Sequence, residues 1–355
     1  MRRLVALALA LLVTSCRERR DEQPAPPPAV SVPPALVPKV VSGSFQAMGT
    51  SIELKVWTDR EVPARAAMND AFAEIKRLEA MMTVWSETSE ISKINANAGG
   101  AAVAVSDEML DVLEGARRIY DESHGVFDIS FYAFKGLWRF DHDGVDEIPS
   151  DDAIKARLPL IDGKKVEIDR KAKTARLGQK GMLINLGGIA KGYAVDKAAA
   201  VLAKHGFTDV VVQAGGDLLV KGRKGEAPWR VGIRDPRGPD GDFFAVAPIR
   251  DAAFSTAGDY ERGFVKDGVR YHHILDPRTG KPANACRSVT ILAPDALTAD
   301  EIDDAIFILG PEEGMKLLDK HPGAGAVIVD KDNKVHISAN LKNVVEIVHP
   351  PTPGI

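Results

Sequence analysis

The sequence predicts an α+β fold, because helical and extended patterns are mixed along the chain without the strict alternation of a parallel α/β protein. Apolar residues recur at helical intervals in some segments and alternate with polar residues in others. The chain has 355 residues, of which 45% are hydrophobic, so it can bury a substantial core. These observations fit one large domain or two smaller ones.

The N-terminus has the pattern of a bacterial export signal. Two arginines precede an apolar run over residues 4–13, which is shorter than the roughly 20 residues that span a bilayer. The ending VTSC is typical of a lipobox, in which Cys16 is lipidated and becomes the first residue after cleavage. An ordinary secretory signal with a chance cysteine is the alternative. We therefore expect a signal peptide over residues 1–16 and a protein lipid-anchored at the membrane, facing the periplasm.

Residues 17–42 are rich in charge and then in proline. Such a segment cannot pack a core and favours extended polyproline conformations. We expect it to be a tether between the membrane and a folded domain over residues 43–350.

Charge and cysteine content narrow the possible functions. The formal net charge is −4 and the basic residues form no stripe suited to a phosphate backbone, so we expect no nucleic-acid partner. Besides Cys16 the chain has one cysteine, Cys286, which leaves no intrachain disulfide if Cys16 is lipidated. We interpret Cys286 as a small buried hydrophobic residue.

The first half of the domain contains one predicted strand and two long predicted helices. The stretch FQAMGTSIELKVW, residues 45–57, ends in alternation and predicts a strand entered through a glycine turn. Apolar spacing predicts a helix over residues 62–82, and a second over 106–123 with Ser106 as N-cap. Between them we expect a polar loop with one short helix.

The second half opens on two glycine turns. A helix over residues 188–206 follows the apolar segment MLINLG, predicted to be a strand, and precedes the predicted strand DVVVQ. Such a turn lets backbone groups approach a ligand. The segment AGGDLLVKG adds a second turn, which ends in Asp217. Strands and turns follow Trp229, and GAVIVD predicts a strand near the C-terminus.

The stretch TADEIDDAIFILG, residues 298–310, begins with acidic residues and ends apolar. One interpretation places Thr298 at the N-cap and the acids in the first helical turn, where they complement the helix dipole. The other starts from Asp300 and Asp304, which lie four residues apart and therefore project from one helix face. Two such carboxylates suit a divalent cation.

Four stretches together resemble the ApbE-type FAD:protein FMN transferases. They are AMGT, FDIS, LGGIAKGYAVDKAA with GGDLLVKG, and STAGDYERGFVKDGVRYHHILDPRTGKPA before the acidic helix, in family order over residues 45–310. The resemblance implies a T-fold-like α+β architecture with FAD as substrate in a cleft. It also implies Mg²⁺-dependent transfer of FMN from FAD to a threonine or serine hydroxyl of an exported redox protein, with release of AMP.

Two alternatives to this activity stay open. A periplasmic FAD pyrophosphatase would cleave FAD to FMN and AMP with water. A flavin-binding lipoprotein would hold FAD without turning it over.

The resemblance implies roles for individual residues. Asp300 and the side chain four residues later would bind Mg²⁺ together with the backbone carbonyl of Gly188. That later residue is Asp304, where the family usually has threonine. Asn185 stands where the family usually has aspartate. His273, the second histidine of YHHILDPRTG, matches the catalytic base, and the pKa of an imidazole near neutrality suits that task.

The resemblance also implies a set of FAD contacts. Trp85 would stack on an aromatic ring of FAD, with core packing as the alternative, and Lys191 would face phosphate at a helix N-terminus. The full set is Met48, Trp85, Val126, Phe127, Asp128, Asn185, Lys191 and Ile274.

Other acids near these motifs receive lesser roles. We expect Asp217 and Asp196 next to the site or at the ribose. We expect Glu301 and Asp303 to be solvated, with Asp303 the nearer to the ion.

Overall fold

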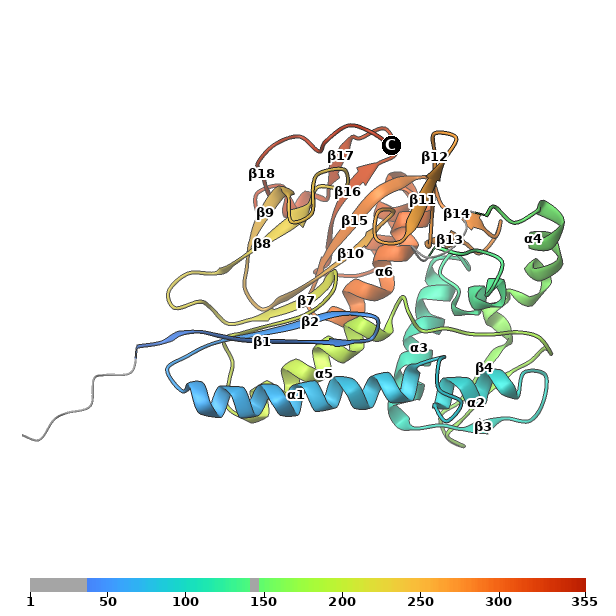
Figure 1. Cartoon of the computed structure of the whole chain (residues 1–355), viewed down its shortest axis with the longest axis horizontal. Helices are drawn as coiled ribbons and strands as arrows, with labels where there is room; N and C mark the ends of the chain where they lie inside the picture. The colour runs from blue at the N-terminus through green and yellow to red at the C-terminus, as the bar shows by residue number, and fades with distance from the viewer. Residues whose placement is uncertain (1–36, 141–146) are drawn as a thin grey trace, which may run out of the picture. The chain divides into compact units, whose positions relative to one another are not determined.

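The computed structural model describes residues 37–140 and 147–355 (Figure 1). Cys16, the signal peptide and the tether up to residue 36 lie outside the described residues, so those assignments stay predictions. The first strand begins at Lys39, which places the start of the folded chain before the expected position 43. Within the described residues, no helix combines the length and apolar character needed to cross a membrane.

An eight-stranded sheet, antiparallel at every pairing, lies at the centre. The single strand expected over residues 45–57 is in fact a hairpin, which turns at Met48 and Gly49. In spatial order the strands are β1 (Lys39–Ala47), β2 (Thr50–Thr58), β6 (Val210–Ala214), β7 (Asp217–Lys221), β10 (Ala252–Gly258), β15 (Cys286–Ala293), β16 (Gly325–Asp330) and β17 (Val335–Ile337).

The central sheet separates two cores, because successive side chains of a strand point to opposite faces. Leu219 and Ala253 belong to the core beneath the helices, whereas their neighbours Leu218 and Phe254 belong to the other core. That second core is closed by a three-stranded sheet of β8 (Trp229–Arg234), β9 (Phe243–Ile249) and β18 (Glu346–Ile347).

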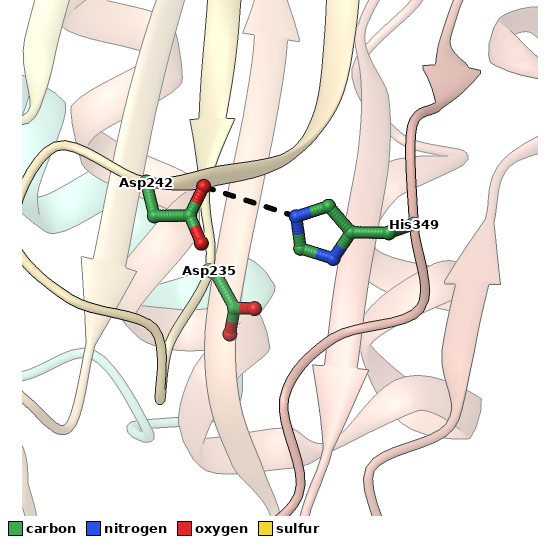
Figure 2. A group of neighbouring side chains, drawn as sticks. All are labelled: Asp235, Asp242 and His349. Carbon is green, nitrogen blue, oxygen red and sulfur yellow. Dashed lines mark ion pairs between the residues drawn. The ribbon is translucent and has the colours of Figure 1, made fainter.

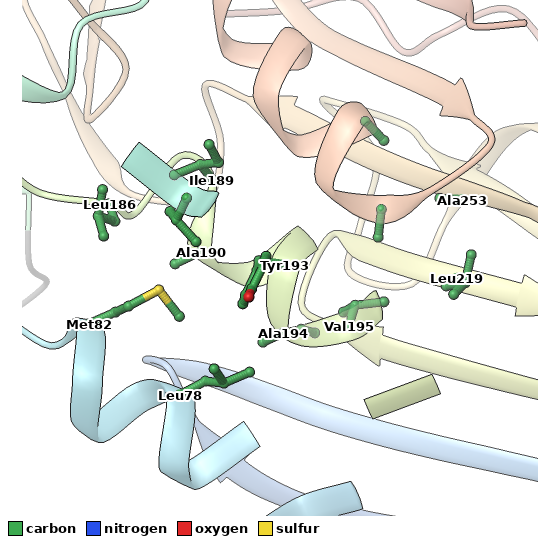
Figure 3. Close-up of a cluster of buried hydrophobic side chains, with 14 of the residues drawn as sticks. Leu78, Met82, Leu186, Ile189, Ala190, Tyr193, Ala194, Val195, Leu219 and Ala253 are labelled. Carbon is green, nitrogen blue, oxygen red and sulfur yellow. The ribbon is translucent and has the colours of Figure 1, made fainter. Parts of the chain in front are cut away.

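Three helices cover the first face of the central sheet: α1 (Glu61–Met82), α5 (Ala190–Lys204) and α6 (Ala296–Leu309). Helix α5 contacts both of the others, and Figure 3 shows Leu78 and Met82 of α1 gathered around Tyr193 of α5. A β-carbon at Gly192 would lie 2.3 Å from the carbonyl oxygen of Ala296, so glycine is required where α5 crosses α6. The start of α5 is therefore held firmly in the core.

Shorter elements complete the domain around the central sheet and its helices. The helix expected over residues 106–123 is confirmed as α3, with Ser106 as its N-cap, and the polar loop before it holds one short helix, α2. The remaining elements are α2 (Glu90–Ala96), β3 (Val103–Ala104), α3 (Asp107–Glu122), η1 (Ile129–Phe134), α4 (Asp151–Arg157), η2 (Leu158–Leu160), η3 (Gly163–Lys165), β4 (Val166–Asp169), β5 (Thr174–Leu177), β11 (Gly263–Lys266), β12 (Val269–His272), β13 (Leu275–Asp276), β14 (Lys281–Pro282), α7 (Pro311–Leu318) and η4 (Ala339–Leu341).

The strand expected at MLINLG is wrong, since residues 182–187 join no strand pairing. Their backbone is held instead by a side chain: the Asn95 amide donates to the carbonyl of Ile184 at 2.9 Å and accepts from its N–H at 2.8 Å. The segment is apolar and buried like a strand, but an asparagine takes the place of a neighbouring strand.

The acidic helix α6 begins earlier than expected. Its N-cap is Asp295, which accepts from the N–H of Thr298 at 2.8 Å, so Thr298 is already inside the helix. The acids consequently lie beyond the first turn, and Asp300, Glu301 and Asp303 are buried. Complementing the helix dipole from a solvated first turn is therefore the wrong explanation for this charge.

Candidate active site

A cavity of about 720 Å³ lies between the start of α5, the face of α6, the β1–β2 turn and the residues after β12. Its size is within the range of small-molecule and cofactor sites. The described residues expected to bind metal, bind FAD or act as the base all line this cavity, namely Met48, Trp85, Val126, Phe127, Asp128, Asn185, Gly188, Lys191, His273, Ile274, Asp300 and Asp304.

The floor of the cavity is a buried cluster of carboxylates. Oxygens of Asp217, Asp300 and Asp303 lie within 4.8 Å of one another. Lys191 Nζ lies 2.5 Å from Asp217 Oδ2 and 3.2 Å from Asp300 Oδ1. The Ser255 hydroxyl contacts both Asp217 and Asp303. Because a hydroxyl has one proton to donate, it can satisfy only one of these two carboxylates at a time.

Negative charge exceeds positive charge at this floor. Burial raises the pKa of Asp300 to about 7 and the pKa of Asp304 to about 6. The pKa of Asp303 is also raised, first by burial and then by the neighbouring Asp304 and Asp300. Burial alone would lower the pKa of Lys191, but its ion pairs raise that pKa well above the usual value. A bound cation would relieve the repulsion among these carboxylates.

The three expected metal ligands all line the cavity, although the carboxylate oxygens that lie within 4.8 Å of one another are those of Asp217, Asp300 and Asp303 and do not include Asp304. Asp300 and Asp304 are one turn apart on α6, and Asp300 Oδ2 accepts the N–H of Gly192 at 2.8 Å. A β-carbon at Gly188 would lie 2.8 Å from Asp304 Oδ2, so the side chain of Asp304 lies against the backbone of Gly188. The donors around this point are all oxygens, the ligands that Mg²⁺ prefers.

The mouth of the cavity carries His273, directly after β12. The β11–β12 register pairs Gly263 with His272, and one step further the His273 N–H donates to the carbonyl of Arg262 at 3.2 Å. The ring Nδ1 lies 3.4 Å from the same carbonyl oxygen. A proton on Nδ1 directed there leaves the lone pair of Nε2 available.

The imidazole of His273 is in the right charge state for a base. Its pKa is lowered to about 4, mainly by burial and to a lesser degree by the neighbouring His272, Arg262 and Lys191. The ring is therefore neutral at pH 7 and can accept a proton. His272 points elsewhere: it is buried, with Nε2 2.6 Å from the carbonyl oxygen of Ala283.

Trp85 stands at the edge of the cavity with 84% of its surface exposed. The alternative that it is ordinary core is wrong. The ammonium of Lys135 lies 5.7 Å from the centre of its ring. An exposed indole at a cavity edge is available for stacking on an aromatic ligand.

Met48 lies in the β1–β2 turn with φ +53°, a left-handed conformation that is uncommon outside glycine. Its N–H donates to Glu79 Oε1 at 2.5 Å, and both residues line the cavity. Sequence reasoning missed Glu79, although an acid in the last turn of a helix is unfavourable for the helix dipole and could have drawn notice.

Two expected FAD contacts use their side chains to build the cavity wall. Asp128 is buried and accepts the N–H groups of Ser130 at 2.8 Å and Gly163 at 2.9 Å, and burial raises its pKa. Asn185 Oδ1 accepts the N–H of Gly187 at 2.7 Å and so shapes the glycine turn before α5. Their roles toward FAD stay predictions.

Asp196 has a different position from the one expected, because it does not line the cavity. Its carboxylate accepts the N–H groups of Ala296 at 3.0 Å and Leu297 at 2.9 Å, at the start of α6. Burial raises its pKa to about 6. Asp196 therefore ties α5 to the first turn of α6.

The expectation that Glu301 and Asp303 are solvated is wrong. Glu301 is fully buried, pairs with Arg118 at 2.5 Å, and has a pKa raised by burial to about 7. Asp303 is part of the cavity floor. Cys286 is buried as expected, and burial raises the pKa of its thiol to about 12, which keeps it protonated and unreactive.

A second group of possible metal-binding side chains lies outside the cavity, and Figure 2 shows it: Asp235, Asp242 and His349. Asp235 already accepts two hydrogen bonds from Thr352, one from the backbone N–H at 2.9 Å and one from the side-chain hydroxyl at 2.7 Å. His349 Nδ1 is bonded to the carbonyl of Pro350 at 2.9 Å, and Nε2 lies 3.8 Å from Asp242. These contacts hold the C-terminal segment against the β8–β9 loop.

Fold and site together define a class of protein. An α+β domain with a cofactor-sized cavity, a neutral imidazole at its mouth and an oxygen donor set at its floor has the groups that phosphoryl transfer requires. The sequence model of the ApbE family matches residues 48–328, and the chain belongs to that family.

Relatives match over most of the chain. The FAD:protein FMN transferase of Treponema pallidum is 34% identical over 317 residues, covering 85% of this chain and 87% of the relative. The FAD:protein FMN transferase of Vibrio cholerae is 30% identical over 348 residues, covering 96% and 97%.

Solved structures show the same fold. The ApbE protein from Thermotoga maritima superimposes with a TM-score of 0.78 at 33% identity, over 86% of this chain and 99% of that one. The flavin transferase ApbE from Vibrio cholerae gives 0.77 at 27% identity, over 87% and 100%. The predicted family and α+β architecture are confirmed.

Proposed function

We propose that this protein transfers FMN from FAD to a threonine or serine hydroxyl of an exported redox protein and releases AMP. Relatives named FAD:protein FMN transferase match most of the chain. The observation that carries the proposal is the single cavity that holds both a neutral imidazole and an acidic floor. Neither feature alone would indicate transfer of a phosphoryl group.

Different residues of the chain would carry out different parts of the reaction. The acceptor hydroxyl oxygen attacks the phosphorus on the FMN side of the pyrophosphate, and His273 Nε2 takes the hydroxyl proton. The bond from that phosphorus to the bridging oxygen breaks, and AMP leaves with the bridging oxygen. Trp85 and the Met48 turn hold the flavin, while Lys191 keeps Asp217 and Asp300 in place at the floor.

The floor fits Mg²⁺, with Asp300, Asp304 and the carbonyl of Gly188 as the residues that would hold it. The fit rests on the oxygen-only donor set and on the burial of several carboxylates beside one another, with Lys191 as the one cation that contacts them among the described residues. When bound, the ion offsets the negative charge of the pyrophosphate. Asp304 supplies a charged oxygen where a neutral hydroxyl is usual in the family.

The location of the enzyme is proposed from the sequence alone. A lipidated Cys16 and the proline-rich tether would hold the domain near a membrane on the periplasmic side. Replacing Cys16 with serine should abolish labelling by a lipid precursor and leave the activity of the domain intact. Continued labelling would contradict the lipobox assignment.

One assay separates the proposal from its two alternatives. Purified protein is incubated with FAD and Mg²⁺, with and without an acceptor that carries a flavinylated threonine motif, and AMP and acceptor mass are followed. Transfer requires the acceptor to gain the mass of the FMN group. Equal AMP release in both reactions with no gain in mass would instead indicate a pyrophosphatase, and bound FAD without AMP would indicate storage.

A further inference from the structure

The cavity is poor in cations that are available to a ligand. Its lining includes the acids Glu79, Asp128, Asp217, Glu261, Asp300, Asp303 and Asp304, against the cations Lys135, Lys191 and Arg262. A pyrophosphate brings further negative charge into this cavity. At least one of the three cations should therefore contact the phosphates.

Two of these cations are already engaged. Lys191 is held between Asp217 and Asp300. The ammonium of Lys135 lies over two aromatic rings, 5.7 Å from the centre of Trp85 and 5.4 Å from that of Tyr132.

Arg262 is the third, and its guanidinium is nearly free. Among the described residues its one hydrogen bond is a long contact, 3.5 Å from Nη2 to the carbonyl oxygen of Gly49. A guanidinium has five N–H groups in a planar fork that matches two phosphate oxygens. An exposed arginine at a cavity edge with unused donors is suited to a phosphate ligand.

The backbone places Arg262 directly opposite His273. The β11–β12 register extends by one pair, in which the His273 N–H donates to the Arg262 carbonyl at 3.2 Å. Side chains of directly opposed residues in an antiparallel ribbon project from the same face. Arg262 therefore emerges beside the imidazole, and its far end reaches Gly49 in the turn next to Met48.

The guanidinium of Arg262 lies where the transferred phosphoryl group is expected. A base must come within about 3 Å of the hydroxyl proton that it removes, so the attacked phosphorus lies near His273. We propose, on the basis of the proposed function, that Arg262 binds the phosphoryl group of FAD that is transferred. It donates to the non-bridging oxygens on the FMN side and stabilises their charge as the bond to AMP breaks.

The test compares Arg262→Gln and Arg262→Lys with a matched control, Arg278→Gln. Arg278 is an exposed arginine on the turn between β13 and β14, paired with Asp276 and outside the cavity lining. The control removes the same charge nearby without touching the cavity. Thermal melting of each variant checks its folding.

The first measurement is binding, and it requires no turnover. FMN and riboflavin share the flavin ring, but only FMN carries the phosphate, so the ratio of their dissociation constants isolates the phosphate contact. We expect Arg262→Gln to reduce the preference for FMN over riboflavin about 10- to 100-fold. Arg262→Lys should keep part of that preference, and Arg278→Gln should keep all of it.

The second measurement is AMP release from FAD. Arg262→Gln should lower kcat by about 10² or more, because the contact strengthens as charge develops. An Arg262→Gln variant with the parent's FMN preference, or an Arg278→Gln variant with an equal loss, would overturn the inference. Normal FMN preference with a loss confined to protein flavinylation would assign Arg262 to the acceptor instead. A parent enzyme that releases no AMP would refute the proposed function, while the binding ratio would still test Arg262.

Discussion

The floor and the mouth of the cavity are built in opposite ways. The floor is formed by Asp217 of β7 and by Asp300 and Asp303 of α6, which are buried and held by Lys191 of α5 and Ser255 of β10. The mouth is formed by residues that flank the two-stranded ribbon β11–β12, among them the exposed Arg262 just before β11 and the half-buried His273 just after β12. Floor residues thus serve stability and chemistry together, whereas mouth residues can serve chemistry alone.

This difference decides what a substitution can reveal. At the floor, α5 and α6 approach so closely at Gly192 that a β-carbon would contact Asp300 at 2.7 Å. A change in side-chain volume there disturbs the core as well as the ligand site. At the mouth, an exposed side chain such as that of Arg262 can be shortened into solvent, so activity should change with little effect on the melting temperature.

The largest effect is expected for Asp300→Asn at the floor. The substitution nearly preserves volume and removes the charge that would bind Mg²⁺, so AMP release should fall about 10³-fold or more at any practical Mg²⁺ concentration. The melting temperature should fall little or rise, because one of several repelling carboxylates becomes neutral. An Mg²⁺ titration identical to the parent's would remove Asp300 from the metal site.

The next effect is at the mouth. His273→Ala should lower the rate of AMP release by about 10² to 10⁴, the usual contribution of a positioned base. FAD binding and the melting temperature should stay near the parent values. Among the described residues, the imidazole has one hydrogen bond, and it is a long one, 3.4 Å from Nδ1 to the carbonyl oxygen of Arg262. Unchanged turnover would show that another group accepts the proton.

The family resemblance drew His273 from a local motif, whereas two buried groups were misjudged because their partners are distant in the sequence. The motif YHHILDPRTG is local, and the base, the ribbon and their register all lie within one short segment. On α6, we expected Glu301 to be solvated because its partner Arg118 lies 183 residues away in the sequence and could not be inferred. The apolar segment 182–187 looked like a strand because its partner, Asn95, lies 89 residues from Ile184. Local patterns report burial and periodicity, but they do not report which distant side chain satisfies a buried group.

The same limit applies to the start of α6. Thr298 and Asp295 are both good N-caps by type, and the sequence does not reveal that Asp196 of α5 accepts the N–H groups of Ala296 and Leu297. That tertiary contact stabilises the earlier start of α6, so the acids lie beyond its first turn.

A smaller effect is expected at position 304, where this chain has aspartate and the family usually has threonine. Asp304→Thr should restore a neutral oxygen ligand and keep activity, while the Mg²⁺ concentration for half-maximal rate rises by about tenfold. Asp304→Ala should raise it further, because the oxygen is lost along with the charge. If both variants leave the Mg²⁺ dependence unmoved, Asp304 contacts no ion and only Asp300 contributes to the site from α6.

The smallest effect is a shift in the pKa of His273, which can be measured without an activity assay. It tests how far the ring at the mouth of the cavity is shielded from water. The pKa of His273 is lowered to about 4 by burial, whereas that of His349 is raised by its bond to the Pro350 carbonyl and by the nearby Asp242. An NMR titration of the ring protons of the free enzyme, assigned with His273→Ala and His349→Ala, should therefore give His273 a midpoint well below 6.5 and His349 one above it. Because the unfolded chain binds a proton at His273 where the folded chain does not, this residue should make the protein less stable as pH falls from about 6.5 toward 4. A midpoint near 6.5 for His273 would mean that water solvates the ring freely. Burial would then not be what keeps His273 neutral. The catalytic histidine would be solvent-accessible, in contrast to the buried carboxylates of the floor.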